Sequence, residues 1–142
     1  EALERAIFLE KFPNTAINVE VEIDDSNAGS RGAALTAASV ALADAGIPMR
    51  DLVVGVSVGK AGGHIIVDLN KEEEDAPDAV DIPIALLPTT NELVLLQMDG
   101  LLTKKEWEEA IKLGLEASKK VYEIQKKALN EKYVKIAKEA TQ

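Results

Sequence analysis

The chain has 142 residues, of which 46% are hydrophobic, carries a formal charge of −9 at pH 7 and contains no cysteine. This length is typical of one compact domain, the absence of cysteine excludes disulfides and thiolate metal sites, and every apolar run is shorter than the roughly 18 residues that cross a bilayer. The short apolar runs and the lack of cysteine lead us to expect a soluble, cytoplasmic protein with no membrane partner. Because lysine and arginine supply most of the affinity for a polyanion, the charge of −9 means that the basic surface for any nucleic-acid substrate is local or borrowed.

Two elements are predicted before the first glycine. Residues 2–12 place apolar side chains at helical spacing, and Pro13 stops the pattern. Residues 15–24 alternate strictly between apolar and polar or acidic side chains. This alternation predicts a half-buried strand whose acidic face points away from the core or toward a partner. Its apolar positions are Ile17, Val19, Val21 and Ile23.

The next predicted element is an apolar helix. A turn cluster at 25–29 precedes residues 30–45, which are rich in alanine and leucine and carry hardly a charge before Asp44. Gly46 suits the position after the last turn, and Pro48 prevents the helix from continuing. Because this helix is apolar on all sides, we expect it to be buried on all sides.

The remainder of the chain predicts a sheet and a long helix. Pro83 implies that its strand is an edge strand or contains a bulge. Thr103 and Glu106 have the spacing of a capping box, and Trp107 and Tyr122 belong to the apolar stripe of one long helix or two successive helices. The order of elements predicts an α+β fold with helices packed against a mostly antiparallel sheet. The expected strands are residues 52–58, 64–69, 80–87 and 93–98, the first two joined by a glycine-rich hairpin.

Gly29, Ser30 and Arg31 stand where the apolar helix begins. A helix start offers unpaired backbone N–H groups and the positive end of the helix dipole, so a glycine, a hydroxyl and a guanidinium placed there can bind an oxyanion. The alternative is an ordinary helix start in which Ser30 is the N-cap and Asp24 or Asp25 pairs with the guanidinium. The residues alone leave both interpretations open.

The acidic run at 71–81 contains Asp75 and Asp81, six residues apart. Such a pair is a candidate metal or general-acid site, although a charged segment between strands is more often a solvated loop. Asp81 begins an apolar strand, where a side chain is held in place, and this favours a function. Asp78 fits the spacing less well, and we expect it to face solvent.

A resemblance to a known family rests on two runs, AGSRGAALTAASVALADAGIPMRDLVVGVSVGK and HIIVDLNKEEEDAPDAVDIPIALLP. They are similar to the RNase PH-like phosphorolytic exoribonucleases, and within that family to the catalytic subunits of archaeal RNA exosomes. The resemblance covers residues 12–134 and rests on several motifs in order. It implies an RNase PH-like fold of the ribosomal protein S5 domain 2-like class. It also implies that residues 1–142 are a single domain that corresponds to the second half of the family chain.

The resemblance implies a reaction and roles for the five candidate residues. In this family inorganic phosphate attacks the last phosphodiester of RNA at its 3′ end and releases a nucleoside diphosphate, and the reverse reaction adds nucleotides. The residues matching Gly29, Ser30 and Arg31 bind the attacking phosphate. The residues matching Asp75 and Asp81 form the catalytic pair and hold a divalent ion, Mg²⁺ or Mn²⁺. Asp81 is the better candidate to protonate the leaving oxygen.

The resemblance also implies partners. Family members form rings of six related subunits, and the archaeal catalytic subunit alternates with an inactive paralogue beneath RNA-binding cap subunits. Two alternatives stay open, a non-catalytic RNA-binding ring subunit and a tRNA-trimming RNase PH. Inactive paralogues lack the aspartate pair, which disfavours the first alternative.

Overall fold

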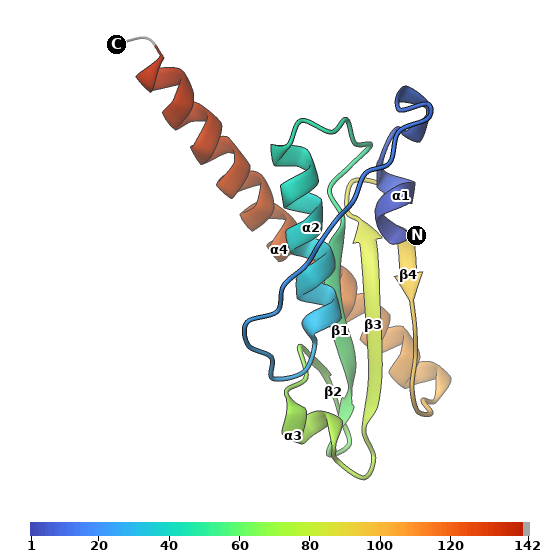
Figure 1. Ribbon diagram of the computed structural model, residues 1–142. Helices are drawn as coiled ribbons and strands as arrows, with labels where there is room; N and C mark the ends of the chain where they lie inside the picture. Colours follow the sequence, from blue (N-terminus) through green and yellow to red (C-terminus); the bar gives the residue numbers. More distant parts are fainter. Residues whose placement is uncertain (141–142) are drawn as a thin grey trace.

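Figure 1 shows the computed structural model of the protein, which describes residues 1–140. Two α-helices and a short 3₁₀ helix precede the first two strands, a third α-helix separates these from the last two strands, and a long helix follows. In chain order the elements are α1 (Ala2–Ala6), η1 (Leu9–Lys11), α2 (Ser30–Asp44), β1 (Val54–Ala61), β2 (His64–Val67), α3 (Lys71–Glu74), β3 (Val80–Leu87), β4 (Glu92–Leu96) and α4 (Lys104–Glu139).

The four strands form one antiparallel sheet in the order β2-β1-β3-β4. In the register between β1 and β3, Ser57 lies opposite Pro83 and Gly59 opposite Asp81. Pro83 therefore lies on an inner strand, so of the two predicted alternatives the edge position is wrong, whereas the bulge is present in β3. The inner position is tolerated because β4 ends at Leu96, so no residue of β4 requires the N–H that proline lacks. The Pro83 carbonyl still accepts from the backbone N–H of Gln97 at 3.1 Å. A bulge lies just beyond, between Ala85 and Leu86 of β3.

Each face of the sheet has its own apolar core, and helices cover both (Figure 1). On one face α4 packs through Ala110, Trp107 and Tyr122 onto the valines and isoleucines of β1 and β3. On the other face α1 and α2 pack against Val53 and Ala85. The predicted α+β fold with helices on an antiparallel sheet is confirmed, as is the core role of Trp107 and Tyr122.

Helix α2 lies close against β1 because two glycines meet there. A Cβ atom on Gly55 would come within 2.5 Å of the Gly32 carbonyl oxygen. The Thr36 hydroxyl accepts from the Gly55 N–H at 2.9 Å, and the Ser39 hydroxyl accepts from the Val53 N–H at 2.7 Å. Side chains of α2 thus satisfy the backbone of β1 where β2 no longer pairs with it.

The outer side of α2 is uncovered, contrary to the prediction of complete burial. Gly32, Ala38, Ser39 and Leu42 face the sheet and are buried. Ala33, Ala37 and Ala41 lie on the opposite side and are exposed. A single sheet can cover only one side of a helix, and no described element packs on the other.

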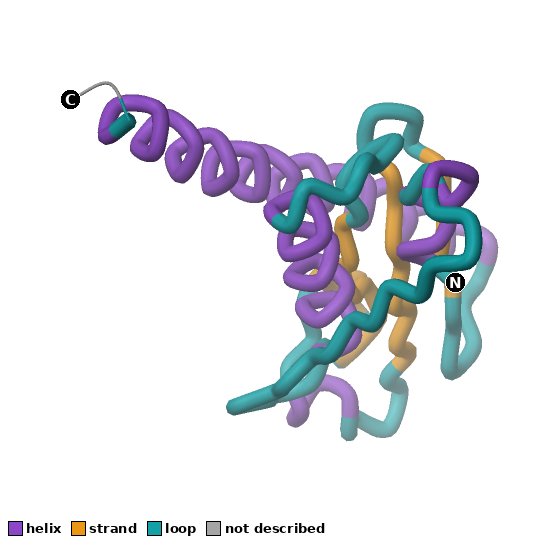
Figure 2. The backbone as a smooth tube through the Cα atoms, turned by 45° about the horizontal axis from the view of Figure 1, so that its top comes forward, coloured by secondary structure: helices purple, strands orange, loops and turns teal. Residues whose placement is uncertain are grey.

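The predicted strand at residues 15–24 is also absent from the structure. This segment has no regular secondary structure and runs as an extended stretch of chain past α2 (Figure 2). Val19, Val21 and Ile23 are 41%, 46% and 53% exposed. A strand requires a neighbour for its backbone groups, and within residues 1–140 none pairs with this segment. The helix predicted for residues 2–12 is shorter as well, since α1 ends at Ala6.

Helix α4 is one continuous helix that begins with the predicted capping box of Thr103 and Glu106. Its C-terminal half projects beyond the sheet (Figure 1). There Lys132 forms an ion pair with Asp44 at 2.6 Å, which connects α4 to the end of α2. Among residues 1–140, neither α4 nor any other helix combines the length and apolar character required to cross a membrane.

Candidate functional site

A cavity of about 270 Å³ opens where the start of α2 faces β1, β3 and α3. It contains residues from both runs of sequence that suggested a function. Its lining residues are Ala28, Gly29, Ser30, Arg31, Gly32, Ser57, Glu74, Asp81 and Pro83.

The chain enters α2 through two residues in the left-handed region. Ala28 has φ +70° and Gly29, the N-cap, has φ +64°. Ser30 is the first helical residue and does not cap the helix, so the interpretation of Ser30 as an N-cap was wrong. No side chain caps this end of α2. The N–H groups of Ser30 and Arg31 therefore remain available to an anion in the cavity.

Arg31 is exposed at the rim of the cavity and donates through Nη1 to Oε1 of Gln97. The predicted alternative partners, Asp24 and Asp25, do not pair with it. Among the described residues the guanidinium has no carboxylate within 4.0 Å. A neutral amide thus orients the guanidinium without neutralising its positive charge.

Asp81 is fixed by both its backbone and its side chain. Its N–H donates to the Asp99 carbonyl at 3.0 Å, and its carbonyl accepts from the Asp99 N–H at 2.9 Å. The Ser57 hydroxyl donates to Asp81 Oδ1 at 2.6 Å. Ser57 is only 5% exposed, so this hydrogen bond lies in a largely dry environment. Asp81 therefore has a set orientation in the cavity, as its position at the start of a strand predicted.

Asp75 lies outside the lining of the cavity. It follows α3 as the C-cap residue, is 63% exposed and pairs with Lys71 at 2.6 Å. The hydrogen bond and the charge of Asp75 raise the pKa of Lys71. The preceding residue, Glu74, lines the cavity instead. The structure thus brings Gly29, Ser30, Arg31 and Asp81 together and leaves Asp75 beside them.

Asp78 is exposed, as expected, and it also has a structural role. Its carboxylate accepts from the N–H groups of Gly62 and Gly63 at 3.0 and 2.7 Å, which closes the turn between β1 and β2. These two hydrogen bonds lower the pKa of Asp78.

The carboxylates at the cavity suit a hard cation. Glu74 and Asp81 present oxygen ligands, which Mg²⁺ and Mn²⁺ prefer. Within residues 1–140 no cluster of three or more His, Asp or Glu side chains is arranged to hold a metal ion. Mg²⁺ commonly keeps several waters and binds through one or two carboxylates plus substrate phosphates. The donor set fits an ion of that kind.

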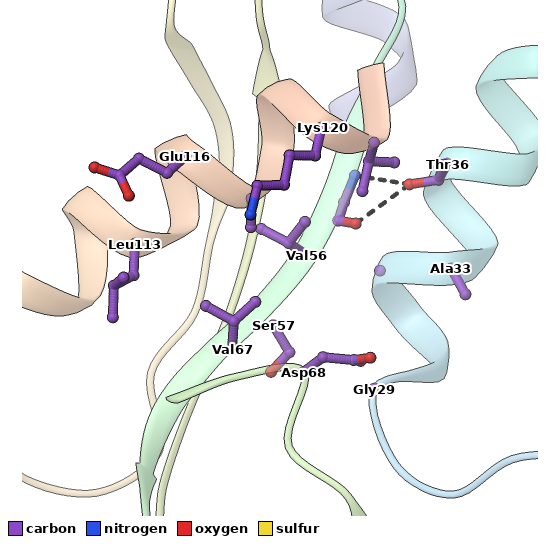
Figure 3. A pocket seen from close by; sticks show the side chains of 14 residues that line it. Gly29, Ala33, Thr36, Val56, Ser57, Val67, Asp68, Leu113, Glu116 and Lys120 are labelled. Carbon is purple, nitrogen blue, oxygen red and sulfur yellow. Dashed lines mark hydrogen bonds between the residues drawn. The ribbon is translucent and has the colours of Figure 1, made fainter. Parts of the chain in front are cut away.

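Figure 3 shows a second, larger cavity of about 520 Å³ between α2 and α4, beside the part of β1 that β2 leaves unpaired. The hydrogen bonds between Thr36 and Gly55 close one end of it. Its walls are mostly apolar, with Asp68, Glu116 and Lys120 at the edges. Gly29, Gly32 and Ser57 border both cavities, but Arg31 and Asp81 line only the smaller one.

Two residues of the site were not predicted from the sequence, Ser57 and Gln97. Ser57 stands between two valines in β1, and its place beside Asp81 follows from the register of β1 with β3. Gln97 follows the apolar run of β4. Neither type of residue in such a setting carries a recognisable signal.

Comparison with known proteins agrees with this architecture. Residues 51–117 match the 3′ exoribonuclease family, domain 2, and residues 1–48 match domain 1 of the same family. The exosome complex component Rrp41 of Pyrococcus furiosus is 56% identical over 138 residues, which cover 97% of this chain and 55% of the relative. Rrp41 of Nitrosopumilus maritimus is 53% identical over 133 residues, which cover 94% of this chain and 54% of the relative. The chain thus spans about half the length of these curated relatives.

A solved structure supports the fold. Rice Rrp46 superimposes with a TM-score of 0.67 over 74% of this chain and 50% of that chain, at 24% sequence identity. At this identity the likeness concerns the fold alone. Together with the two family matches, which leave only residues 49, 50 and 118–142 outside, these findings settle the relationship. The chain belongs to the RNase PH-like 3′ exoribonuclease family.

Proposed function

We propose that this chain carries the phosphate-binding and acid–base groups of a phosphorolytic 3′→5′ exoribonuclease, the catalytic subunit of an archaeal exosome. One observation supports the proposal above others: Ser30 and Arg31 share a cavity with Asp81, fifty residues further along the chain. An anion site and a fixed carboxylate in one cavity are what an attack by phosphate on a phosphodiester requires.

Inorganic phosphate binds at the start of α2. The N–H groups of Ser30 and Arg31, the Ser30 hydroxyl and the Arg31 guanidinium all donate to its oxygens, while Gly29 allows the backbone to approach closely. One phosphate oxygen attacks the terminal phosphorus of the RNA, and the bond from that phosphorus to the 3′ oxygen of the preceding nucleotide breaks. The products are a nucleoside diphosphate and an RNA shortened by one nucleotide. The reverse reaction extends RNA.

Asp81, protonated at the start of the step, would give its proton to the departing 3′ oxygen and regain one from the attacking hydrogen phosphate, which loses its proton as it becomes part of the diphosphate. Ser57 holds the carboxyl group in the orientation required for this transfer. A divalent cation, Mg²⁺ or Mn²⁺, would be held by Asp81 and Asp75, with Glu74 as the neighbouring carboxylate, and would neutralise charge on the phosphates. Phosphoryl transfer depends mainly on positioning and charge, so these groups suffice for the chemistry that this chain contributes.

The chain acts within an assembly. With a charge of −9 and only three arginines, it supplies at most a small part of the basic surface that holds RNA. Its Rrp41 relatives are named as components of an exosome complex. We place the chain in a cytoplasmic ring of six subunits with an inactive paralogue, beneath RNA-binding cap subunits, where neighbouring chains provide most of the RNA contacts.

Replacement of one carboxyl group tests the proposal. Asp81→Asn should abolish phosphate-dependent release of nucleoside diphosphate from RNA by the reconstituted complex, because an amide cannot donate the required proton. Asp24→Asn, which removes an exposed carboxylate outside the cavity, is the matched control and should keep full activity. Equal activity of the Asp81 variant and the unaltered complex would refute the assignment. An unaltered complex that binds RNA but releases no diphosphate would identify a non-catalytic subunit.

A further inference from the structure

Gln97 connects the phosphate end of the cavity to the carboxylate end. Its side-chain oxygen accepts from Arg31, 66 residues earlier in the chain. Its backbone N–H donates to the carbonyl of Pro83, which lines the cavity. Two residues later, Asp99 is bonded in both directions to Asp81. The segment 97–99 is therefore attached to β3 at both ends, and the position of Gln97 relative to Asp81 is set by the backbone.

The neutrality of the Gln97 side chain matters as much as its position. A buried or paired arginine in a protein usually meets a carboxylate, which orients the guanidinium and cancels its charge. Here the acceptor is a neutral amide, so the guanidinium is oriented while its full charge is kept. One of its five N–H donors is occupied by Gln97, and the others are left for an anion. This arrangement suits a site that must bind and release a doubly charged ligand.

A role in stability alone does not explain the contact. Arg31 and Gln97 are both exposed. The alkyl chain of Arg31 belongs to the surface of α2, and an exposed hydrogen bond contributes little to folding. The contact connects two elements that are already held by one apolar cluster: Leu35 of α2 and Val94 and Leu95 of β4 all pack against the core that contains Val53 and Ala85. What it determines is the direction of the guanidinium.

We propose that Gln97 is a positioning residue that aims Arg31 at the attacking inorganic phosphate, and that its neutral side chain sets the affinity for that dianion. This inference rests on the proposed phosphorolytic function. A glutamate at the same position would accept the same hydrogen bond but would neutralise Arg31 and repel the phosphate. A leucine would remove the acceptor and leave the guanidinium unoriented.

The test compares Gln97→Glu and Gln97→Leu with Asn91→Asp in the reconstituted complex. Asn91 lies in the exposed turn between β3 and β4, so its replacement adds the same single charge away from the cavity. The measured quantities are KM for inorganic phosphate, kcat and the midpoint of thermal unfolding. We expect Gln97→Glu to raise KM for phosphate by about tenfold or more, as for loss of one charge-assisted hydrogen bond, with a smaller change in kcat. Gln97→Leu should raise it less, and Asn91→Asp should leave it unchanged.

Coupling to Arg31 makes the test specific. In an Arg31→Ala background, Gln97→Glu should change KM for phosphate by a smaller factor than it does when Arg31 is present, because its effect acts through the guanidinium. An unaltered complex whose rate does not depend on phosphate would overturn the proposed function itself. A phosphate-dependent complex in which Gln97→Glu keeps the original KM would overturn only the role of Gln97. Equal increases in KM for phosphate in Gln97→Glu and Asn91→Asp would also overturn the role of Gln97, since both would then reflect only the net charge of the chain.

Discussion

Asp75 and Asp81 differ in how firmly their carboxylates are held. Asp81 accepts from the nearly buried Ser57 hydroxyl, and its backbone is bonded in both directions to Asp99. Asp75 makes one exposed ion pair with Lys71. Exposed pairs of this kind contribute about 0–1 kcal/mol. The Asp75 carboxylate can therefore leave Lys71 at little cost, and we regard it as the adjustable partner of the fixed Asp81.

This difference leads to a prediction for the metal. Asp75→Asn should raise the Mg²⁺ concentration that supports half-maximal diphosphate release by about tenfold or more, because an amide is a weaker ligand for a hard cation than a carboxylate. A magnesium titration of the assay measures this. Lys71→Ala, which only frees Asp75, should not raise the requirement. If Asp75→Asn behaves as the unaltered chain does and Glu74→Gln shows the increase, Glu74 is the ligand.

Which site residues could be predicted depends on whether their role is local. Arg31, two residues after Gly29 at a helix start, and Asp81, at a strand start, each combine a reactive group with a local setting that a sequence displays. Ser57 and Gln97 have no such setting. Their contacts depend on the pairing of β1 with β3 and on the residue at which β4 stops pairing, and both are tertiary features.

At the scale of elements, the start of α4 is fastened to the hairpin of β1 and β2. Glu106 closes the capping box with Thr103 and also pairs with Lys60 of β1 at 2.7 Å. Both side chains of the pair are largely shielded, at 21% and 26% exposure. The hydrogen bond from Lys60, followed by those from Thr103, lowers the pKa of Glu106 to about 2. One carboxylate thus joins the cap of α4 to the sheet.

The lowered pKa of Glu106 predicts how stability depends on pH. In the unfolded chain this carboxyl has its ordinary pKa of 4.5, so its contribution is complete above that value and is lost as pH falls toward about 2. Thermal unfolding between pH 6 and pH 2.5 should show a smaller decrease in midpoint for Glu106→Gln than for the unaltered chain. The control is Glu108→Gln on the same turn, whose carboxylate is 65% exposed and pairs with Lys104 at 3.8 Å. Parallel curves for the Glu106 variant and the unaltered chain would contradict the assignment.

Elements were predictable where their partners lie within the chain. The alternating and β-branched runs of β1 and β3 become strands because they pair with each other and bury their valines and isoleucines. The equally regular alternation at 15–24 produces no strand, because within the described chain no neighbour offers an edge. The outer side of α2 is uncovered for the same reason. In both cases the pattern has no packing partner among the described residues 1–140.

At the scale of the whole molecule, these two uncovered features lie next to each other. The extended segment at 15–24 runs past α2 in both views of the backbone (Figures 1 and 2). A shallow cavity formed by residues 21–29 and the alanines of α2 joins them. Exposed apolar side chains that alternate along one segment, beside an apolar helix side, form a surface suited to the edge and face of a sheet. The curated relatives are about twice as long as the matched region.

We therefore expect this surface to be covered by the part of the relatives that this chain does not match. In the isolated chain the amides of residues 16–24 should exchange with solvent rapidly, because they lack partners. When the chain is expressed together with the unmatched part of Pyrococcus furiosus Rrp41, exchange at alternate amides of this segment should slow by about a hundredfold or more, as in paired strands. Amides of β3, which are already paired, provide the internal reference.

The alternation itself supplies the matched variants for this experiment. Val21→Asp places a charge on the apolar face of the segment, whereas Glu22→Gln alters the neighbouring position on the acidic face. Because successive strand residues point to opposite sides, the first change should prevent association with the added polypeptide and the second should not. Both residues are exposed in the chain alone, so neither change should lower its own unfolding midpoint by more than a few degrees. Association that tolerates Val21→Asp as well as Glu22→Gln would show that this segment does not pair as a strand, and that the partner of α2 approaches from another direction.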